Sequence, residues 1–247
     1  RERDVGFLLR EGIAQQAAGA HVLDVNVGLR GTDEPALLQD VVSELQAVTE
    51  LPLQIDTANP AAMEAALRRY NGKAMLNSVN GKAESMRAVF PLARKYGALV
   101  VALTLDEDGI PETAEGRVRI AEKILRTAAE YGLGAHDLVF DPLTMAVSAD
   151  AGAALTTLGA VRQIGKDLGC HTLLGVSNVS FGLPARGMLN AAFLTCALEN
   201  GLSAAILNPH AAEMQAAVRT FCALHGLDEG CRSYLDFATA LPASAPA

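Results

Sequence analysis

The stretch from His171 to Gly182, HTLLGVSNVSFG, indicates how this chain folds. Its residues 172–176 form an apolar run that is too short for a helix, which is typical of a buried strand. Ser177 and Asn178 follow where that strand should reach the surface, and a helical pattern resumes after Pro184. Parallel barrels place polar side chains at the carboxyl ends of their strands and build their sites there. The stretch therefore predicts a parallel α/β fold with a site at the strand ends.

The rest of the chain repeats this pattern on both sides of the stretch. Seven apolar runs of strand length are each followed by a segment of helical periodicity, and one helical segment precedes the first run. The expected strands are 21–27, 53–56, 74–79, 99–105, 137–144, 172–176 and 204–208. Strict alternation predicts a parallel sheet with right-handed crossovers. An open doubly wound sheet is the alternative, but no GxGxxG follows the first run and polar residues end nearly every strand, which favours a (β/α)8 TIM barrel.

The order of elements also predicts the domain organisation. The chain opens with a helical segment, so the first strand of a barrel is missing from the numbered residues. We expect the chain to begin inside a larger polypeptide, and the barrel to stay open between Val22 and the last strand or to be closed by a segment outside this numbering. We assign residues 1–232 to the barrel and 233–247, which end in ALPASAPA, to a linker-like tail.

Composition excludes several classes of function. The 247 residues carry a net charge of −8 with no basic run, which argues against nucleic acid and anionic membranes as partners. No apolar run reaches the roughly 18 residues of a membrane span and no signal peptide is visible, so we expect a cytoplasmic protein. The four cysteines include no CxxC pair, which predicts reduced thiols and no metal site.

Polar residues at the expected strand ends are the candidates for chemistry. They are Asp24, Asn26, Asp56, Asn77, Asp141, Asn178 and Asn208. Each alone is an ordinary residue for a turn or a helix cap. In a barrel, however, all of them would converge on one mouth. Carboxylates and amides there could bind a flat heterocycle, since a carboxylate accepts two parallel N–H bonds from an amino-pyrimidinone edge as it does from a guanidinium.

Six segments in order carry a family resemblance. They are LDVNVG, QIDTANP, MLNSVNG, LTLDEDGIPETAEGR, FDPLT and LGVSNVSFGLPARGMLNAAFL. Over about residues 1–225 the chain resembles the pterin-binding barrel of methyltetrahydrofolate:corrinoid methyltransferases, and most of all the folate domain of cobalamin-dependent methionine synthase. The opening strand of that family, a GERIN-like segment, is absent here.

The resemblance implies a role for each strand-end residue. Asp56, Asn77 and Asp141 match positions that hold the pterin ring. Asn178 matches the catalytic asparagine that hydrogen-bonds N5 of the folate. Further matches are Asp24 and Asn26, which line the pocket, and Gly175 and Ser177, in the strand motif where a small residue lets the ring approach the backbone. The methyl group of methyltetrahydrofolate would pass to cob(I)alamin carried by a separate domain or protein, with the final acceptor left open.

Other functions remain as alternatives. A dihydropteroate synthase needs an Arg-x-His near the last strand, but SAAILNPHAAE offers His210 without that arginine. A Schiff-base aldolase needs a lysine at a strand end, and none lies there. A non-catalytic folate-binding or corrinoid-docking module is the third alternative. Arg117 and Arg186 are expected in loops at the functional end, with Arg117 either solvated or bound to the glutamate tail of a folate.

Overall fold

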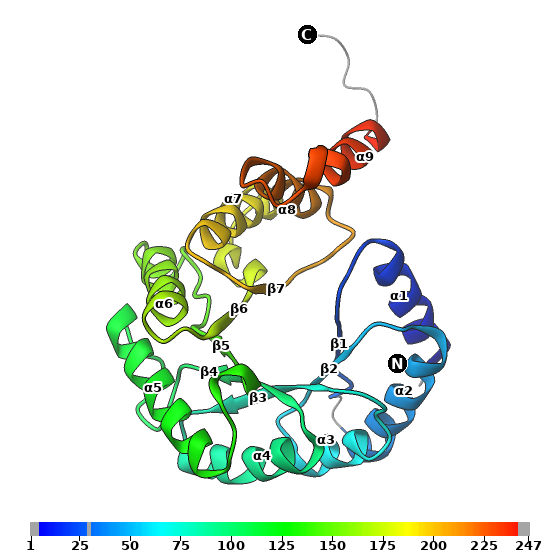
Figure 1. Cartoon of the computed structure of the whole chain (residues 1–247), viewed down its shortest axis with the longest axis vertical. Coiled ribbons are helices and arrows are strands. Elements are labelled where there is room, and N and C mark those ends of the chain that lie inside the picture. Colours follow the sequence, from blue (N-terminus) through cyan, green and yellow to red (C-terminus); the bar gives the residue numbers. More distant parts are fainter. Residues whose placement is uncertain (1–4, 29–30, 242–247) are drawn as a thin grey trace.

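The computed structural model describes residues 5–28 and 31–241, and these form a ring of parallel strands surrounded by helices (Figure 1). The strands are β1 Leu23–Val25, β2 Leu53–Asp56, β3 Met75–Asn80, β4 Leu99–Leu103, β5 Leu138–Asp141, β6 His171–Gly175 and β7 Ala204–Ile206. The helices are α1 Val5–Ala17, α2 Glu34–Val48, α3 Pro60–Leu67, α4 Ala83–Tyr96, α5 Ala114–Glu130, α6 Ala153–Asp167, α7 Arg186–Glu199, α8 Ala212–Leu224 and α9 Arg232–Ala240. Short 3-10 turns are η1 Ala135–Asp137, η2 Val176–Ser180 and η3 Glu229–Cys231.

The seven strands make one parallel sheet in the order β1-β2-β3-β4-β5-β6-β7. Each strand is followed by a helix, as the sequence predicted, and every neighbouring pair is parallel. Within the described residues β1 and β7 do not pair, and Figure 1 shows the ring open between β1 with α1 on one side and β7 with α8 on the other. The described part of the chain thus forms the predicted TIM barrel with seven strands, open at this seam.

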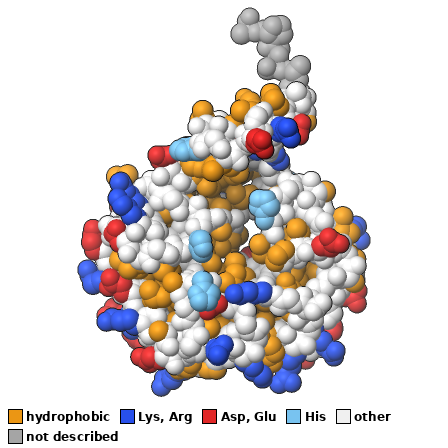
Figure 2. Space-filling view, viewed as in Figure 1, with side chains coloured by type: hydrophobic (Ala, Val, Ile, Leu, Met, Phe, Trp, Pro, Cys, Tyr) orange, Lys and Arg blue, Asp and Glu red, His pale blue; other side chains and the backbone are white. Residues whose placement is uncertain are grey.

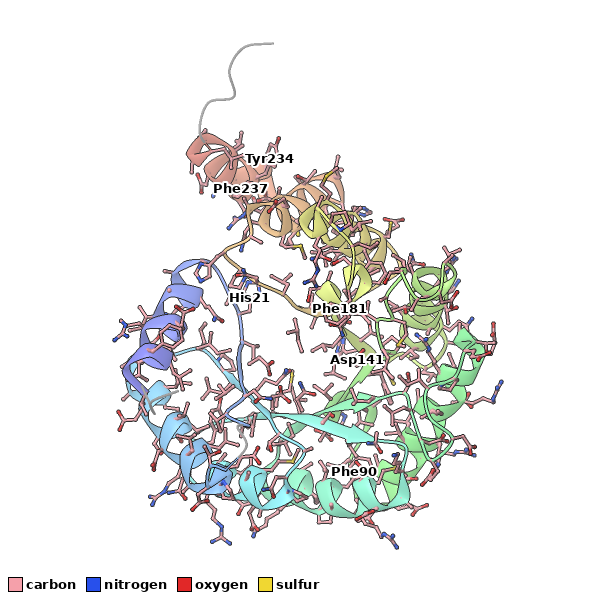
Figure 3. The ribbon with its side chains drawn as sticks, turned by 180° about the vertical axis from the view of Figure 1, so that it is seen from behind. His21, Phe90, Asp141, Phe181, Tyr234 and Phe237 are labelled. Carbon is pink, nitrogen blue, oxygen red and sulfur yellow. The ribbon has the colours of Figure 1, made fainter. Side chains whose placement is uncertain are left out.

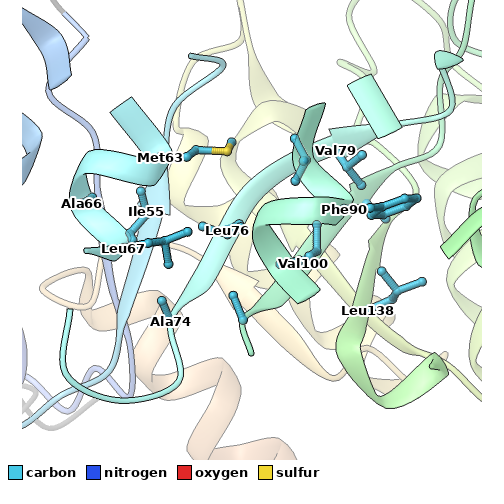
Figure 4. Packing of buried hydrophobic residues seen from close by; sticks show 14 of the residues in the cluster. Ile55, Met63, Ala66, Leu67, Ala74, Leu76, Val79, Phe90, Val100 and Leu138 are labelled. Atoms are coloured by element: carbon cyan, nitrogen blue, oxygen red, sulfur yellow. The ribbon is translucent and has the colours of Figure 1, made fainter. Parts of the chain in front are cut away.

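Alternation along each strand separates two apolar layers. Residues such as Ile55, Leu76, Val100 and Leu138 point outward and are fully buried against the helices, where Phe90 of α4 joins them (Figure 4). The opposite faces pack together in the barrel interior, where the cluster consists of Val101, Val139 and Leu173 with Met75, Leu103, Ala204 and Ile206 against it. Because parallel strands bury both faces, they read as continuous apolar runs.

The starts of α2, α3 and α5, after β1, β2 and β4, are fixed by capping side chains. Asn59 accepts a hydrogen bond from the N–H of Ala61, with Pro60 in the first turn of α3, as the sequence predicted. Thr113 caps α5 in the same way by accepting from the N–H of Gly116 at 3.1 Å. The caps at Asn59 and Thr113 fix where the chain enters α3 after β2 and α5 after β4.

Two segments differ from the sequence prediction. Residues 233–240, placed in the linker-like tail, belong to α9, which packs on α8 and projects from the barrel (Figure 1). None of the residues of this helix is buried. The polar segment after β6 is a 3-10 turn, η2, and not an extended strand end. The expected helical start at residues 1–4 and the last residues, 242–247, lie outside the described part of the chain.

The outer surface carries charge of both signs. On the face seen in Figure 2, acidic and basic side chains stand mostly around the perimeter, and apolar side chains are prominent toward the centre. No described helix is both long enough and apolar enough to cross a membrane.

Candidate functional site at the carboxyl ends of the strands

Amide and carboxylate side chains of β1 and β2 are paired in the barrel interior. Leu23 and Val25 face the helices, so Asp24 between them faces inward. The buried Gln54 of β2 donates from Nε2 to Oδ1 of Asp24 at 2.7 Å. One layer higher, Asn26 donates from Nδ2 to Oδ2 of Asp56 at 2.9 Å. These two bonds orient the carboxylates of Asp24 and Asp56 before any ligand binds.

The pKa of the Asp24 carboxyl is raised well above its usual value. Desolvation by the surrounding protein raises the pKa of its carboxyl from 3.8 to about 6, and the nearby charge of Asp56 adds to the rise. Hydrogen bonds from Gln54 and Asn77 favour the ionised form and oppose the shift. The side chain of Asp24 is exposed, so solvent screening reduces the contribution of this pKa shift to the stability of the fold.

Asp56 and Asn77 are direct neighbours on adjacent strands. Their Cα atoms are partners in the register of β2 and β3, so both side chains emerge at the same level of the mouth. The loop after Asp56 is held by Glu34 at the start of α2, whose carboxylate accepts from the hydroxyl of Thr57 and from Nδ2 of Asn59 at 3.4 Å. Glu34 is thus a supporting residue of this edge that the sequence did not indicate.

Asp141 is the last residue of β5, which β4 separates from β3 in the sheet. Figure 3 shows it beside the centre of the ring. Its Oδ1 accepts from the N–H of Leu143 at 2.7 Å, which folds residues 141–143 into a turn with a positive φ of 67° at Leu143. Desolvation raises the pKa of Asp141 to about 7, and the backbone bond and the charge of Arg117 oppose the rise. An acid with this pKa changes its charge at physiological pH.

Arg117 is not the solvated loop residue expected from the sequence. It lies in the first turn of α5 with only 3% of its surface exposed. Its Nη1 lies 2.8 Å from the carbonyl oxygens of Pro142 and of Leu143 and 3.1 Å from Oγ1 of Thr157. Its Nε donates to the carbonyl of Pro111 at 3.1 Å. The prediction of a solvated arginine was wrong. Arg117 binds backbone carbonyls of a loop about 25 residues further along the chain, and no local sequence pattern shows such contacts.

Asn178 lies on η2, directly after β6. A Cβ atom placed on Gly175 would come within 3.5 Å of Nδ2 of Asn178, so the amide of Asn178 lies over the bare backbone of Gly175. Ser177 is exposed, and its carbonyl accepts from Nη2 of Arg186 at 2.7 Å. Arg186 also donates from Nε to Oγ of Ser180 at 2.9 Å and packs on the ring of Phe181.

The structure links four of the predicted residues directly. Asp24, Asn26, Asp56 and Asn77 form one linked group on β1 to β3, while Asp141 and Asn178 stand on β5 and η2. Asn208 binds back to the N–H of His210 at 3.0 Å and belongs to a turn.

Gln54 is a site residue that sequence reasoning missed. The signal was its two-residue spacing from Asp56, which puts both on one face of the strand.

A small hollow of about 80 Å³ adjoins the site, lined by Asp24 and Asn26 together with residues of α1 and α2 such as Leu8, Glu11 and Leu45. No metal cluster extends the site within the described part of the chain. No group of three or more His, Cys, Asp or Glu side chains could hold a metal ion there. A hollow of about 470 Å³ lies between the loop after β4 and α5, lined among others by Asp106, Ile110, Arg119 and Lys123. None of the strand-end residues lines it, so it is separate from the candidate site.

Comparison with known proteins agrees with the barrel fold. A family model described as "Pterin binding enzyme" matches residues 3–208. The chain belongs to the pterin-binding enzyme family. It is 32% identical over 238 residues to the methylcorrinoid:tetrahydrofolate methyltransferase of Eubacterium limosum, covering 94% of this chain and 87% of that protein. It is 33% identical over 207 residues to methionine synthase of Mycobacterium tuberculosis, covering 78% of this chain but 17% of that much longer protein.

Solved structures support the fold. Dihydropteroate synthase from Stenotrophomonas maltophilia superposes with a TM-score of 0.73 at 20% identity, over 90% of this chain and 89% of that one. The enzyme from Xanthomonas albilineans gives a TM-score of 0.69 at 21% identity, over 90% of this chain and 85% of that one. At this identity the likeness extends to the barrel and not to the reaction.

Proposed function

We propose that this protein binds a tetrahydrofolate in the barrel mouth and transfers a methyl group between N5 of the folate and the cobalt of a corrinoid carried by another domain or protein. The observation that carries the proposal is the set of Asp56, Asn77 and Asp141 at the carboxyl ends of β2, β3 and β5, in a chain that matches a methylcorrinoid:tetrahydrofolate methyltransferase over nearly its full length.

The pterin edge explains the residue types at these three positions. An amino-pyrimidinone presents adjacent N–H donors, and carboxylates of Asp56 and Asp141 are suitable acceptors for them. Asn77 offers both a donor and an acceptor, which suits a ring that alternates carbonyl oxygens and ring nitrogens. Because Asn26 and the N–H of Leu143 already orient the two carboxylates, little ordering remains to be done when the ring binds.

Asn178 is the residue that we assign to the reacting nitrogen. N5 of methyltetrahydrofolate leaves as a poor anion unless it is protonated, so a proton at N5 must accompany methyl transfer. The side-chain oxygen of Asn178 can accept a hydrogen bond from N5–H, and this bond is strongest when the nitrogen carries that proton. Gly175 lies next to this amide, and a Cβ atom there would be in ordinary van der Waals contact with Nδ2 of Asn178 at 3.5 Å.

The corrinoid is the second substrate in this reaction, and the barrel mouth has features that suit it. When bound, it supplies the cobalt nucleophile or the methyl donor. Met145, Phe181 and Met188 are exposed on the segments that follow β5 and β6, and such apolar side chains suit the edge of a large macrocycle. The contribution of this chain is to present the methyl-bearing face of the pterin at the open end of the barrel.

The direction of transfer depends on supply and not on the pocket. The relative from Eubacterium limosum is named for transfer from a methylcorrinoid to tetrahydrofolate, whereas methionine synthase is named for its product. The same residues hold the pterin and N5 in both directions, by microscopic reversibility. Assays should therefore be run from both methyltetrahydrofolate and methylcobalamin.

Binding of methyltetrahydrofolate tests the proposal. Asp141→Asn removes one carboxylate acceptor and should weaken binding by about 1–3 kcal/mol, the range for a hydrogen bond to a charged group. Calorimetric titration and stopped-flow transfer to free cob(I)alamin are the measurements. Asp40→Asn, on the exposed outer face of α2, is the matched control and should leave both unchanged.

Three results would contradict the proposal. The wild-type chain could fail to bind methyltetrahydrofolate, it could bind but transfer no methyl group, or folded Asp141→Asn could bind with unchanged affinity. The second result would point to a non-catalytic folate-binding module. Incorporation of para-aminobenzoate would instead indicate a dihydropteroate synthase.

A further inference from the structure

Arg117 holds the segment that carries Asp141 from three sides. Its guanidinium reaches the carbonyls of Pro142 and Leu143, both at 2.8 Å, and so contacts the two residues that follow Asp141. It also contacts Thr157 of α6, whose hydroxyl in turn donates to the carbonyl of Leu143 at 3.0 Å. The turn is therefore fixed to α5 and α6 and not only to its own strand.

Neutral acceptors surround the charge of this arginine. The four contacts of its Nε and Nη1 are three backbone carbonyls and one hydroxyl, and no carboxylate of the described residues forms an ion pair with it. Burial of this cation is costly, and its hydrogen bonds to these four oxygens offset part of the cost. Asp141 is the acid on which its field acts.

The geometry assigns Arg117 as a positioning residue for Asp141, which fixes the turn at residues 141–143 and favours the ionised form of the Asp141 carboxylate at the pterin edge. This inference rests on the proposed function, because it concerns the same pocket. Arg117 makes no contact with the ligand in this assignment and acts through Asp141 alone.

Other charged groups near the turn do not replace Arg117. The partner of Asp141 in the register of β4 is the apolar Leu103. On the other side, Arg186 of α7 is bound to the carbonyl of Ser177 and to Ser180. Asp24 also titrates in the lumen, so its contribution to any pH profile must be separated by Asp24→Asn.

Removing the charge of Arg117 should change the pKa of Asp141 in a defined direction. The positive charge lowers the pKa of Asp141 and opposes desolvation, so its loss must raise that pKa above about 7. If the ionised carboxylate binds the pterin, wild-type affinity should rise as pH increases through about 7. In Arg117→Met the same rise should move to higher pH, by about one unit or more.

The experiment is a calorimetric titration with methyltetrahydrofolate at a series of pH values. Arg117→Met should bind at least about tenfold more weakly at pH 7, with the midpoint of its profile shifted upward. Arg117→Lys retains the charge but loses the forked geometry, so it should weaken binding and keep the wild-type midpoint. Arg119→Met, an exposed cation two residues along α5, is the control, and Asp141→Asn should abolish the pH step.

The outcomes separate this inference from the proposed function. If wild-type protein does not bind methyltetrahydrofolate, the proposed function fails. If wild-type protein binds with a pH step that Asp141→Asn removes, but Arg117→Met keeps both affinity and midpoint, only the role of Arg117 is overturned. Equal weakening at every pH, without a shifted midpoint, or failure of both arginine variants to fold, would make Arg117 a purely structural residue and would also overturn it.

Discussion

At the scale of single residues, Asn178 should matter more for turnover than for binding. Its bond to N5 is worth most when that nitrogen carries a proton, and this is how the transition state differs from the bound substrate. Asn178→Ala should lower methyl transfer by roughly a hundredfold or more. Folate affinity should fall far less, because Asp56, Asn77 and Asp141 still hold the opposite edge of the ring.

The comparison of rate and affinity decides this prediction. Stopped-flow transfer to free cob(I)alamin and an equilibrium titration should be run on the same preparation. Equal factors in rate and affinity would make Asn178 a uniform binder, and no change in either would remove it from the site. Thr195→Ala, an exposed residue on α7, serves as the control.

Residue identity alone predicted the acids and amides but not the side chains that support them. Asp56 and Asp141 could be predicted because a polar residue at the carboxyl end of an apolar barrel strand emerges at the mouth, where such barrels bind their ligands. The burial of Arg117 was not predicted, although this residue falls on the same helical stripe as the buried Ile120 and Ile124. A charged residue on an apolar stripe was the signal, but its partners are carbonyls about 25 residues away, which no local pattern shows.

At the scale of elements, strand positions could be predicted to within one to three residues because apolar runs and helix caps are local. Asn59 and Pro60 set the start of α3 where the sequence placed it. The exception was η2, because its shape depends on a side chain from the next helix. Arg186 binds the carbonyl of Ser177 and the hydroxyl of Ser180, which closes residues 176–180 into a turn.

This clamp leads to a prediction for the element that carries Asn178. Arg186→Met removes both hydrogen bonds and the contact with Phe181 at 4.9 Å, so the turn should loosen. We expect methyl transfer to fall by about tenfold, about 1.4 kcal/mol in activation free energy, with little change in folate affinity. Arg162→Met, exposed on α6, is the control. An unchanged transfer rate would show that η2 keeps its shape without the arginine.

At the scale of the whole molecule, the described part of the barrel has an open seam between β1 and β7 and two outer apolar clusters of unequal size. One large apolar cluster extends from α1 to Ile164 of α6 and to Cys170 and includes Phe90, while a smaller one joins residues of β6, α6, α7 and α8. β1 and β7 each have only one hydrogen-bonded neighbour among the described strands. Edge strands carry unpaired backbone groups, so opening should start from both sides of the seam.

Amide hydrogen exchange on the 247-residue chain measures this asymmetry. The N–H of Leu23 is bonded to the carbonyl of Pro52 in the direction of β2, so the alternation of a strand points the N–H of Asp24 toward the seam. That amide should exchange with little protection, while Val101 of β4, paired on both sides and fully buried, should approach the free energy of global unfolding. Equal protection at Asp24 and Val101 would mean that another strand covers β1. Protection that rises with protein concentration would identify that strand as part of a second copy, and protection independent of concentration would place it within the same chain.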